Sequence, residues 1–308
     1  MNPKFTVAIP LYNKKQYISR CLSSVKNQTY TNFDILIIDD GSTDMSNEAV
    51  KDWLNKNKDV QYSVTMKRQE NIGALKTRNL LIQNSENRFV AFLDADDIWL
   101  PNHLNELKKL IIKHIDQVTL FSTGYYKHKG NDRASHNLGK YSEYFGILDY
   151  FTAMSQSSGY LNSSVVCIDK IKLPLEVFSL DFSVKVNEDL LVWSKLACDK
   201  GLAFSAVKTA INYIDAAEAS KGGQLLDTFL VYNGILLMSK SWTNHTNVRR
   251  YARIFAAKNI ASFRLNNSFR GFFKQVFSCF TVKTFFPSFL SVLFLFVPKF
   301  LIRLKMII

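Results

Sequence analysis

The stretch FVAFLDADDIWLPNHL, residues 89–104, decides the fold, because it joins a short apolar run to a group of acids and then to a helix. The apolar run Phe89–Leu93 is bounded by polar residues and predicts a buried strand. Pro101 suits the first turn of the following helix. The carboxylates Asp94, Asp96 and Asp97 are therefore expected at the C-terminal end of a strand, where open α/β sheets bind their ligands.

Three carboxylates within four residues repel one another, so the group is stable at low cost only in solvent or around a cation. A solvated turn followed by a helix cap is the simpler explanation of an isolated D-x-D pattern. The position behind a buried strand favours a metal instead. Hard oxygen ligands select Mg²⁺ or Mn²⁺ over Zn²⁺, and these ions bind one or two carboxylates together with substrate phosphates. The pattern predicts a metal–diphosphate site.

Composition limits the possible classes of protein. A chain of 308 residues with 47% hydrophobic content can form one large domain, or one domain with an appendage, and is not disordered. Residues 1–10 lead into a strand without an apolar signal core, so we expect the part of the chain that carries these acids to stay in the cytoplasm. The four cysteines have no metal-binding spacing and fit a reduced compartment.

The net charge of +13 is concentrated at one end of the chain. After Asp227 there are 12 Lys and Arg residues and no acid, whereas the preceding part has 27 basic and 26 acidic residues. The basicity therefore belongs to the tail, and the part of the chain before it is not expected to bind nucleic acid.

Strands and helices alternate through the first half of the chain. The expected strands are Phe5–Ile9, Phe33–Ile38, Val60–Met66 and Phe89–Leu93. The expected helices are Lys14–Asn27, Met45–Asn55 and one that opens at Asn71–Gly73 and ends near Gln83. This order predicts an α/β fold with a doubly wound, mostly parallel sheet and right-handed crossovers.

Segments with polar groups follow these strands and should meet at one edge of the sheet. They are Pro10, Tyr12 and Asn13 after the first strand, Asp39 and Asp40 after the second, and Asn71, Gly73, Lys76 and Arg78 after the third. Each one could be an ordinary loop residue, and Asp40-Gly41-Ser42 alone is a common turn signal. Their convergence on Asp94 and Asp96 predicts a nucleotide pocket with subsites for a base, a ribose and a metal.

Four segments in order resemble the N-terminal motifs of the family 2 glycosyltransferases of GT-A fold. They are VAIPLYNKKQYISRCLSSVKNQTY (7–30), DILIIDDGSTD (34–44), RQENIGALKTRN (68–79) and FVAFLDADD (89–97). A weaker resemblance continues to about Tyr213. The resemblance to this family implies that Pro10, Tyr12 and Asp40 bind the uracil end of a UDP-sugar, with Asp39 beside Asp40. Arg78 would approach the base or the diphosphate, Asp94 the ribose, sugar and metal, and Asp96 the metal.

The segment VNEDLLVWSKLA, residues 186–197, carries the second group of acids. Glu188 and Asp189 precede an apolar helix face, and acids in a first helical turn also interact favourably with the helix dipole. The resemblance implies instead an E-D pair in which Asp189 is the catalytic base and Glu188 orients it or the acceptor. A single in-line displacement by the deprotonated acceptor would invert the anomeric carbon.

Two departures from the family pattern affect the expected reaction. Many relatives have an Arg and a His shortly after a Tyr, but here Ile214 and Asp215 follow Tyr213. Lys221 or Lys76 is then the candidate to assist the diphosphate. The Gln-x-x-Arg-Trp element of processive synthases is absent, which favours transfer of one sugar per encounter. The polar loop Lys127–Lys140 and Ser155–Ser164 are candidate acceptor contacts, and Ala216–Gln224 is a candidate flap.

The tail is predicted to associate with a membrane. We expect the GT-A catalytic domain at residues 1–215 and a helical region at 216–308, with helices near 225–239 and 248–263. Thr284–Pro298 is uncharged and rich in Phe and Leu, but shorter than the roughly 17–25 residues of a spanning helix. An interfacial anchor is favoured over a spanning helix, a protein-docking surface, a solvated basic helix or a nucleic-acid stripe.

The predicted protein is an inverting, Mn²⁺- or Mg²⁺-dependent glycosyltransferase at the inner face of the cell membrane. It would move a sugar from a UDP-sugar to a hydroxyl of a lipid-linked or lipopolysaccharide-type glycan, with its tail on anionic lipid. A sugar nucleotidyltransferase would have a glycine-rich loop after the first strand, whereas IPLYN has no glycine. A catalytically silent carbohydrate-binding or assembly subunit is the other alternative.

Overall fold

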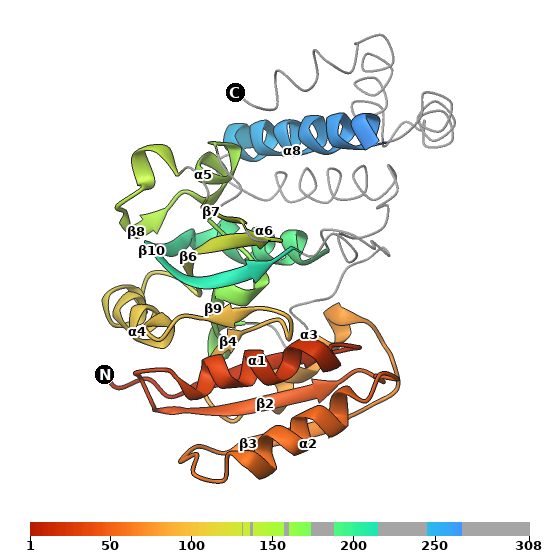
Figure 1. The fold of residues 1–308 in the computed structure, drawn as a ribbon. Coiled ribbons are helices and arrows are strands. Elements are labelled where there is room, and N and C mark those ends of the chain that lie inside the picture. Colours follow the sequence, from red (N-terminus) through yellow and green to blue (C-terminus); the bar gives the residue numbers. More distant parts are fainter. Residues whose placement is uncertain (131, 136–137, 157–159, 174–187, 215–244, 267–308) are drawn as a thin grey trace. The chain divides into compact units, whose positions relative to one another are not determined.

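The structure is a computed structural model that describes residues 1–266 except 131, 136–137, 157–159, 174–187 and 215–244 (Figure 1). The chain divides into two compact units, Met1–Ser179 with Lys200–Ala219, and Leu180–Asp199 with Ser220–Ile308. The predicted domain boundary at residue 215 stays a prediction.

The first four strands of the sheet are parallel, as the alternating pattern predicts. Strands β1 (Phe5–Leu11), β2 (Phe33–Asp39), β3 (Val64–Arg68) and β4 (Phe89–Phe92) pair in the order β3-β2-β1-β4. Helices α1 (Lys15–Lys26), α2 (Ser46–Lys56) and α3 (Ala74–Asn84) connect them. Because all four strands run the same way, the polar segments that follow them lie at one edge of the sheet.

The rest of the sheet is mixed, which corrects the prediction of a mostly parallel sheet. Strand β9 (Val166–Asp169) lies antiparallel between β4 and β6 (Leu120–Lys129), and β10 (Leu202–Tyr213) runs parallel to β6. Two short strands, β5 (Ile98–Trp99) and β8 (Phe145–Leu148), pair antiparallel with β10. An apolar run predicts that a strand is buried but not its direction, which depends on the path of the connecting chain.

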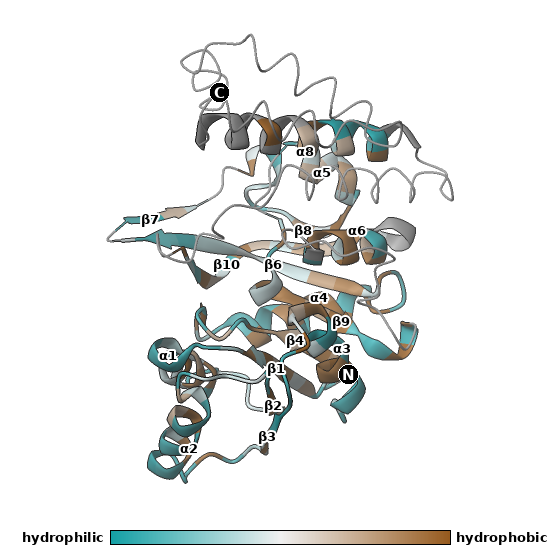
Figure 2. Cartoon of the chain, turned by 90° about the vertical axis from the view of Figure 1, so that its right-hand side faces the viewer, coloured by the Kyte–Doolittle hydropathy of each residue, from teal (hydrophilic) through white to brown (hydrophobic). Residues whose placement is uncertain are grey.

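A hairpin replaces part of the loop predicted at Lys127–Lys140. Residues 127–129 extend β6, which pairs antiparallel with β7 (Asp132–Ser135), and every residue of β7 is exposed. The hairpin end is largely hydrophilic in Figure 2. An exposed edge strand needs no apolar face, so its sequence can be as polar as that of a loop. This is why the polar composition predicted a loop here.

The core of the first unit lies between the sheet and its helices. Helix α1 buries Ile18, Cys21, Leu22 and Val25, which recur at helical spacing, in one apolar cluster. Helix α4 (His103–His114) buries Leu104, Leu107, Leu110 and Ile111 in the same cluster. Short elements complete the unit: η1 (Gly139–Tyr141), α5 (Tyr150–Gln156), η2 (Ser163–Val165) and η3 (Lys170–Lys172).

The described part of the second unit consists of helices α6 (Glu188–Lys200) and α8 (His245–Asn266). Helix α8 confirms the helix predicted near 248–263, and its buried residues Val248, Tyr251, Ala252, Phe255 and Ala256 recur at helical spacing. The predicted helix at 225–239 and the apolar segment Thr284–Pro298 lie outside the described residues. Among the helices described, none combines the length and apolarity needed to cross a membrane.

Candidate functional site

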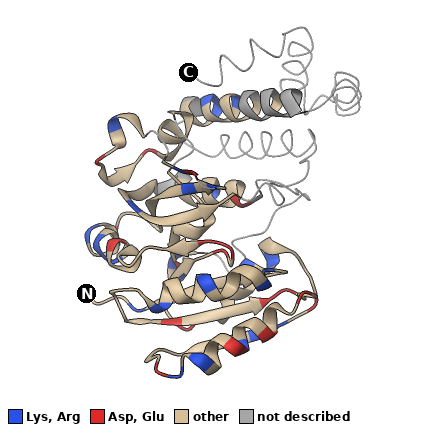
Figure 3. Ribbon diagram, viewed as in Figure 1, with Lys and Arg blue, Asp and Glu red and all other residues tan. Residues whose placement is uncertain are grey.

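A cleft of about 420 Å³ lies in the first unit at the carboxyl edge of the parallel strands. It is lined by Pro10, Leu11, Tyr12, Lys14, Asp40, Asn71, Gly73, Ala74, Thr77, Arg78, Asp94, Ala95 and Asp96. Seven of the ten residues predicted to bind donor or metal are among them; Asn13, Asp39 and Lys76 are not. Acidic residues follow both β2 and β4 (Figure 3).

Asp40 fixes the loop between β3 and α3. Its Oδ1 accepts hydrogen bonds from the Ile72 amide at 2.9 Å and Gln69 Nε2 at 2.8 Å, and its Oδ2 accepts one from the Gly73 amide at 3.0 Å. Gly73 has φ +90°, a backbone conformation that residues with a Cβ rarely adopt. The carboxylate therefore holds the wall of the cleft in shape as well as lining it.

Asn13 and Asp39 connect loops behind the cleft. The Asn13 side-chain oxygen accepts a hydrogen bond from the Thr43 amide at 2.8 Å, and the Asn13 amide donates to Ser42 Oγ at 3.0 Å. Asp39 is fully buried, and its Oδ1 accepts from the Ser42 amide at 2.9 Å. Arg68 Nε lies 3.6 Å from Asp39 Oδ2, an ion pair too long for a hydrogen bond. Lys76 is exposed on α3.

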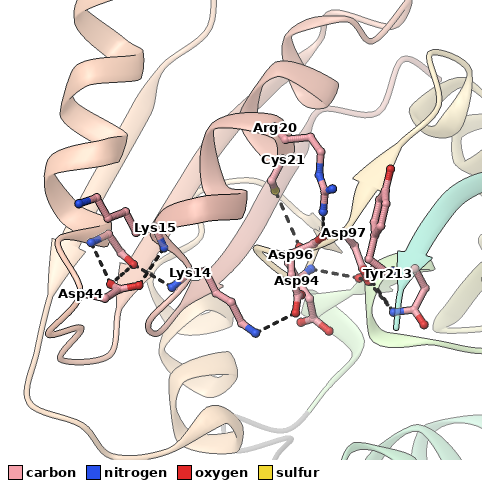
Figure 4. A network of polar contacts seen from close by, with 12 residues as sticks. Lys14, Lys15, Arg20, Cys21, Asp44, Asp94, Asp96, Asp97 and Tyr213 are labelled. Carbon is pink, nitrogen blue, oxygen red and sulfur yellow. Dashed lines mark hydrogen bonds and ion pairs between the residues drawn. The ribbon is translucent and has the colours of Figure 1, made fainter. Parts of the chain in front are cut away.

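Asp94 and Asp96 lie on the cleft side of the turn after β4, and each is paired with a cation. Arg78 donates from Nη2 to Asp94 Oδ1 at 2.8 Å. Lys14 Nζ lies 2.9 Å from Asp96 Oδ2 (Figure 4). Both carboxylates keep about a quarter of their side-chain surface exposed, 29% and 25% respectively. A ligand in the cleft can therefore reach both carboxylates.

The third acid of the turn is directed away from the cleft. Asp97 is fully buried and accepts hydrogen bonds from Ser164 Oγ at 2.5 Å, Asn212 Nδ2 at 2.9 Å and the Tyr213 amide at 2.9 Å. Burial, followed by the charges of Asp94 and Asp96, raises the pKa of Asp97 to about 7. The expectation that all three acids face solvent or a cation is thus wrong for Asp97, which links the turn to β10.

Two residues that the sequence analysis passed over hold the turn from the side of α1. Arg20 donates from Nη2 to the Asp96 carbonyl oxygen at 2.6 Å, and its guanidinium carbon lies 3.6 Å from the centre of the Tyr213 ring. Cys21 Sγ lies 3.8 Å from the Asp94 carbonyl oxygen. Lys14 also lines the cleft, and its position just after the first strand could have identified it. Arg20 carries no such signal.

The model of the Glycosyl transferase family 2 matches residues 6–166, more than half of the chain. The chain belongs to this family. Over 114 residues it is 33% identical to Glycosyltransferase GlyA of Streptococcus pneumoniae, covering 37% of this chain and 16% of that protein. Over 119 residues it is 32% identical to poly(ribitol-phosphate) beta-N-acetylglucosaminyltransferase TarS of Staphylococcus aureus, covering 38% and 20% respectively. The match thus spans less than a quarter of either relative's length.

Solved structures show the same fold. TarS 1-349 in complex with UDP-GlcNAc aligns with a TM-score of 0.69 at 16% identity, over 98% of this chain and 92% of that one. The mannosyltransferase PcManGT of Pyrobaculum calidifontis, in complex with GDP-Man and Mn²⁺, aligns with a TM-score of 0.55 at 14% identity, over 98% and 86%. The mixed α/β sheet of this family 2 chain is therefore that of GT-A glycosyltransferases.

The acids of the cleft suit a cation that also binds a substrate. Among the described residues, no three or more His, Cys, Asp and Glu side chains come together as a metal site. Asp94 and Asp96 are two carboxylates on one turn, and the Asp40 carboxylate is already bound by the β3–α3 loop. Mg²⁺ and similar ions commonly bind one or two protein carboxylates and complete their coordination with phosphate oxygens and water. The residues present fit that arrangement.

The predicted catalytic pair lies in the second unit of this family 2 protein. Helix α6 begins at Glu188, and Asp189 Oδ1 accepts a hydrogen bond from the Leu190 amide at 2.9 Å. Asp189 is partly exposed. Because Asp189 and the cleft belong to different units, its role as catalytic base stays a prediction. Lys221, a candidate replacement for the missing basic residues, lies outside the described residues.

Proposed function

We propose that the chain transfers one sugar from a UDP-sugar to an acceptor hydroxyl, with inversion of the anomeric carbon. The observation that carries this proposal is the single cleft in which Tyr12, Arg78 and the acids of the β4 turn meet. Tyr12 is 47% exposed, so a base can pack against its ring. Basic and acidic groups beyond it are suited to a diphosphate and a sugar.

Each side chain has a chemical task in this proposal. Pro10, Tyr12 and Asp40 bind the uracil, and Arg78 holds Asp94 in place beside the ribose and sugar. Asp189 takes the proton of the acceptor hydroxyl, which typically accelerates a reaction about 10²–10⁴-fold. A Mn²⁺ or Mg²⁺ ion held by Asp96 and Asp94 would, when bound, neutralise the charge that develops on the leaving diphosphate.

The choice of a uridine nucleotide has two supports. One is the sequence resemblance around Tyr12 and Asp40. The other is that the solved structures of TarS with this fold include complexes with UDP and with UDP-GlcNAc. Both support a UDP-sugar donor for this chain without identifying the sugar.

The proposed acceptor is a lipid-linked or lipopolysaccharide-type surface glycan at the inner face of the cell membrane. Support comes from the tail, in which 12 basic residues are interspersed with apolar and aromatic ones after Asp227. Such a segment binds anionic lipid head groups through its charges and the acyl boundary through its Phe residues. A lipid-linked acceptor would lie at the same surface.

The experiment that tests the function is UDP release from a panel of UDP-sugars by the full chain with Mn²⁺. Water serves as the acceptor, so the natural glycan is not needed. We expect Asp96→Ala and Asp189→Asn to lower the rate at least about 100-fold. Asp52→Asn removes an exposed acid of α2 and should leave it unchanged. Equal background rates in all four proteins would support a silent subunit instead.

A further inference from the structure

Lys14 is held at the entrance to α1 with its ammonium group directed into the cleft. The Lys14 amide donates to Ser46 Oγ at 2.8 Å, and the Lys14 carbonyl oxygen accepts from the Tyr17 and Ile18 amides at 2.9 and 3.0 Å. Its backbone is thus fixed by two helices. The side chain lies toward Asp96, where Nζ and Oδ2 are 2.9 Å apart (Figure 4).

The two cations of the cleft are held with different strength. Arg78 is buried on α3 and its planar guanidinium is fixed against Asp94. Lys14 has a flexible stem, and the side chains of Lys14 and Asp96 keep 23% and 25% of their surface exposed. A lysine–carboxylate pair that stays in contact with solvent contributes only a modest free energy. The contact between Lys14 and Asp96 can therefore be broken by a ligand, whereas that of Arg78 is part of the framework.

The charges of the cleft show why such an exchange would matter. Its lining includes three acids, Asp40, Asp94 and Asp96, and two cations, Lys14 and Arg78, which leaves one negative charge. A sugar nucleotide adds about one negative charge per phosphate. A divalent cation offsets this addition, but it needs the Asp96 oxygen that faces the Lys14 ammonium group. Cation and ammonium repel each other at that position.

We propose that Lys14 is a displaceable counter-ion of the donor site. It neutralises Asp96 in the empty cleft, gives up the carboxylate to the divalent cation, and then donates hydrogen bonds to the donor diphosphate. An ammonium group is a compact charge with three donors and suits phosphate oxygens. Lys14 thereby supplies the positive charge that Ile214 and Asp215 do not provide after Tyr213. This role rests on the proposed function.

The test is the binding of Mn²⁺ and of UDP to the full chain, each followed by calorimetry. In Lys14→Gln, we expect Mn²⁺ alone to bind about two- to five-fold more tightly, because a competitor is lost. We expect UDP, added at saturating Mn²⁺, to bind about tenfold more weakly, because a charge-assisted contact is lost. Lys14→Arg, which keeps a cation, should restore most of the UDP affinity.

Lys15→Gln is the matched control. It removes the same charge one residue away, from an exposed side chain whose Nζ contacts Met45 Sδ at 3.7 Å, and should change neither affinity. A tighter affinity for Mn²⁺ together with a weaker affinity for UDP would support the proposed role. A misfolded variant would instead lose affinity for both. Unchanged or weaker Mn²⁺ binding by Lys14→Gln would overturn the proposal. Failure of the unmodified chain to bind UDP would instead overturn the proposed function. The effect of Lys14→Gln on Mn²⁺ binding can be judged separately, because that titration contains no UDP.

Discussion

The three acids of the β4 turn have different roles because their side chains point in different directions. Asp94 and Asp96 line the cleft, whereas Asp97 is buried and accepts from Ser164, Asn212 and the Tyr213 amide. Asp97→Ala leaves all three donors without this acceptor, whereas Asp97→Asn keeps one of the two acceptor oxygens. Both variants remove the charge, so the difference between them isolates the hydrogen bonds. We expect Asp97→Ala to have a free energy of unfolding about 1–3 kcal/mol lower than Asp97→Asn.

Urea unfolding of the two variants at pH 6 in EDTA measures this difference. Equal stabilities would mean that Asp97 does not anchor the turn to β10 through these bonds.

His103 should make the first unit sensitive to acid. Burial lowers the pKa of His103 to about 3, and its Nδ1 lies 2.7 Å from Thr209 Oγ1. Among the residues that the structure describes, none forms a hydrogen bond with its Nε2. Below about pH 6.5 the unfolded chain binds a proton at this residue that the folded chain does not, so stability falls as pH falls. From pH 7.5 to pH 4.5, wild type should lose about 2–3 kcal/mol more than His103→Asn. Parallel pH profiles of the urea midpoints would contradict this.

At the scale of elements, the sequence predicted helices and strands well where the buried positions are apolar and the exposed positions are polar. The apolar runs of β1, β2 and β4 and the helical spacing of α1 predicted those elements closely. Strand β10 was not predicted, because Ser205 and Thr209 interrupt its apolar pattern. Both are buried, and Glu106 and His103 of α4 satisfy them. Such partners come from distant segments and cannot be seen in a local pattern.

The same distinction holds for the site. Residues at strand ends, such as Tyr12 and Asp40, could be predicted because parallel strands bring their ends together. Arg20 could not, because its function depends on a contact with a carbonyl oxygen 76 residues away.

The loop after β2 provides a prediction at this scale. Gly41 has φ +76°, and a Cβ there would lie 2.9 Å from the Asn71 amide nitrogen. Gly41→Ala should lower the free energy of unfolding by about 1–3 kcal/mol and weaken UDP binding, because the displaced Asn71 lines the cleft. Asn adopts a positive φ more readily than Ala does. A loss of UDP binding that is also seen in Gly41→Asn therefore comes from the contact between the new Cβ and Asn71. Thermal unfolding measures the loss of stability, and UDP titration measures the loss of binding. If Gly41→Ala matched wild type in both, the close contact between residue 41 and Asn71 would have no such role.

At the scale of the whole molecule, two units carry different parts of the proposed activity. The donor cleft belongs to the first unit, and the proposed base Asp189 and the basic tail belong to the second. The nearly balanced charge up to Asp227 and the uniformly basic tail after it fit this division. A transferase that acts on a lipid-linked acceptor needs both a nucleotide site and a surface that binds lipid.

Vesicle binding tests the proposed role of the tail. The full chain should bind vesicles of anionic phospholipid more tightly than phosphatidylcholine vesicles, and less tightly as salt rises. Replacing Lys299, Arg303 and Lys305 with Gln should weaken binding by about 3 kcal/mol, roughly 100-fold. The same change at the exposed Lys51, Lys56 and Lys58 of the first unit is the control. Equal losses in the two triple variants would contradict a membrane-binding tail.

The central claim is that strand ends of the first unit form one metal-dependent nucleotide site. Calorimetric titration of UDP into the full chain, with and without Mn²⁺, tests it most directly. We predict binding that requires Mn²⁺ in wild type and in Asp52→Asn, and that is lost in Asp96→Ala. UDP binding that is equally tight without Mn²⁺, or that persists in Asp96→Ala, would contradict the claim.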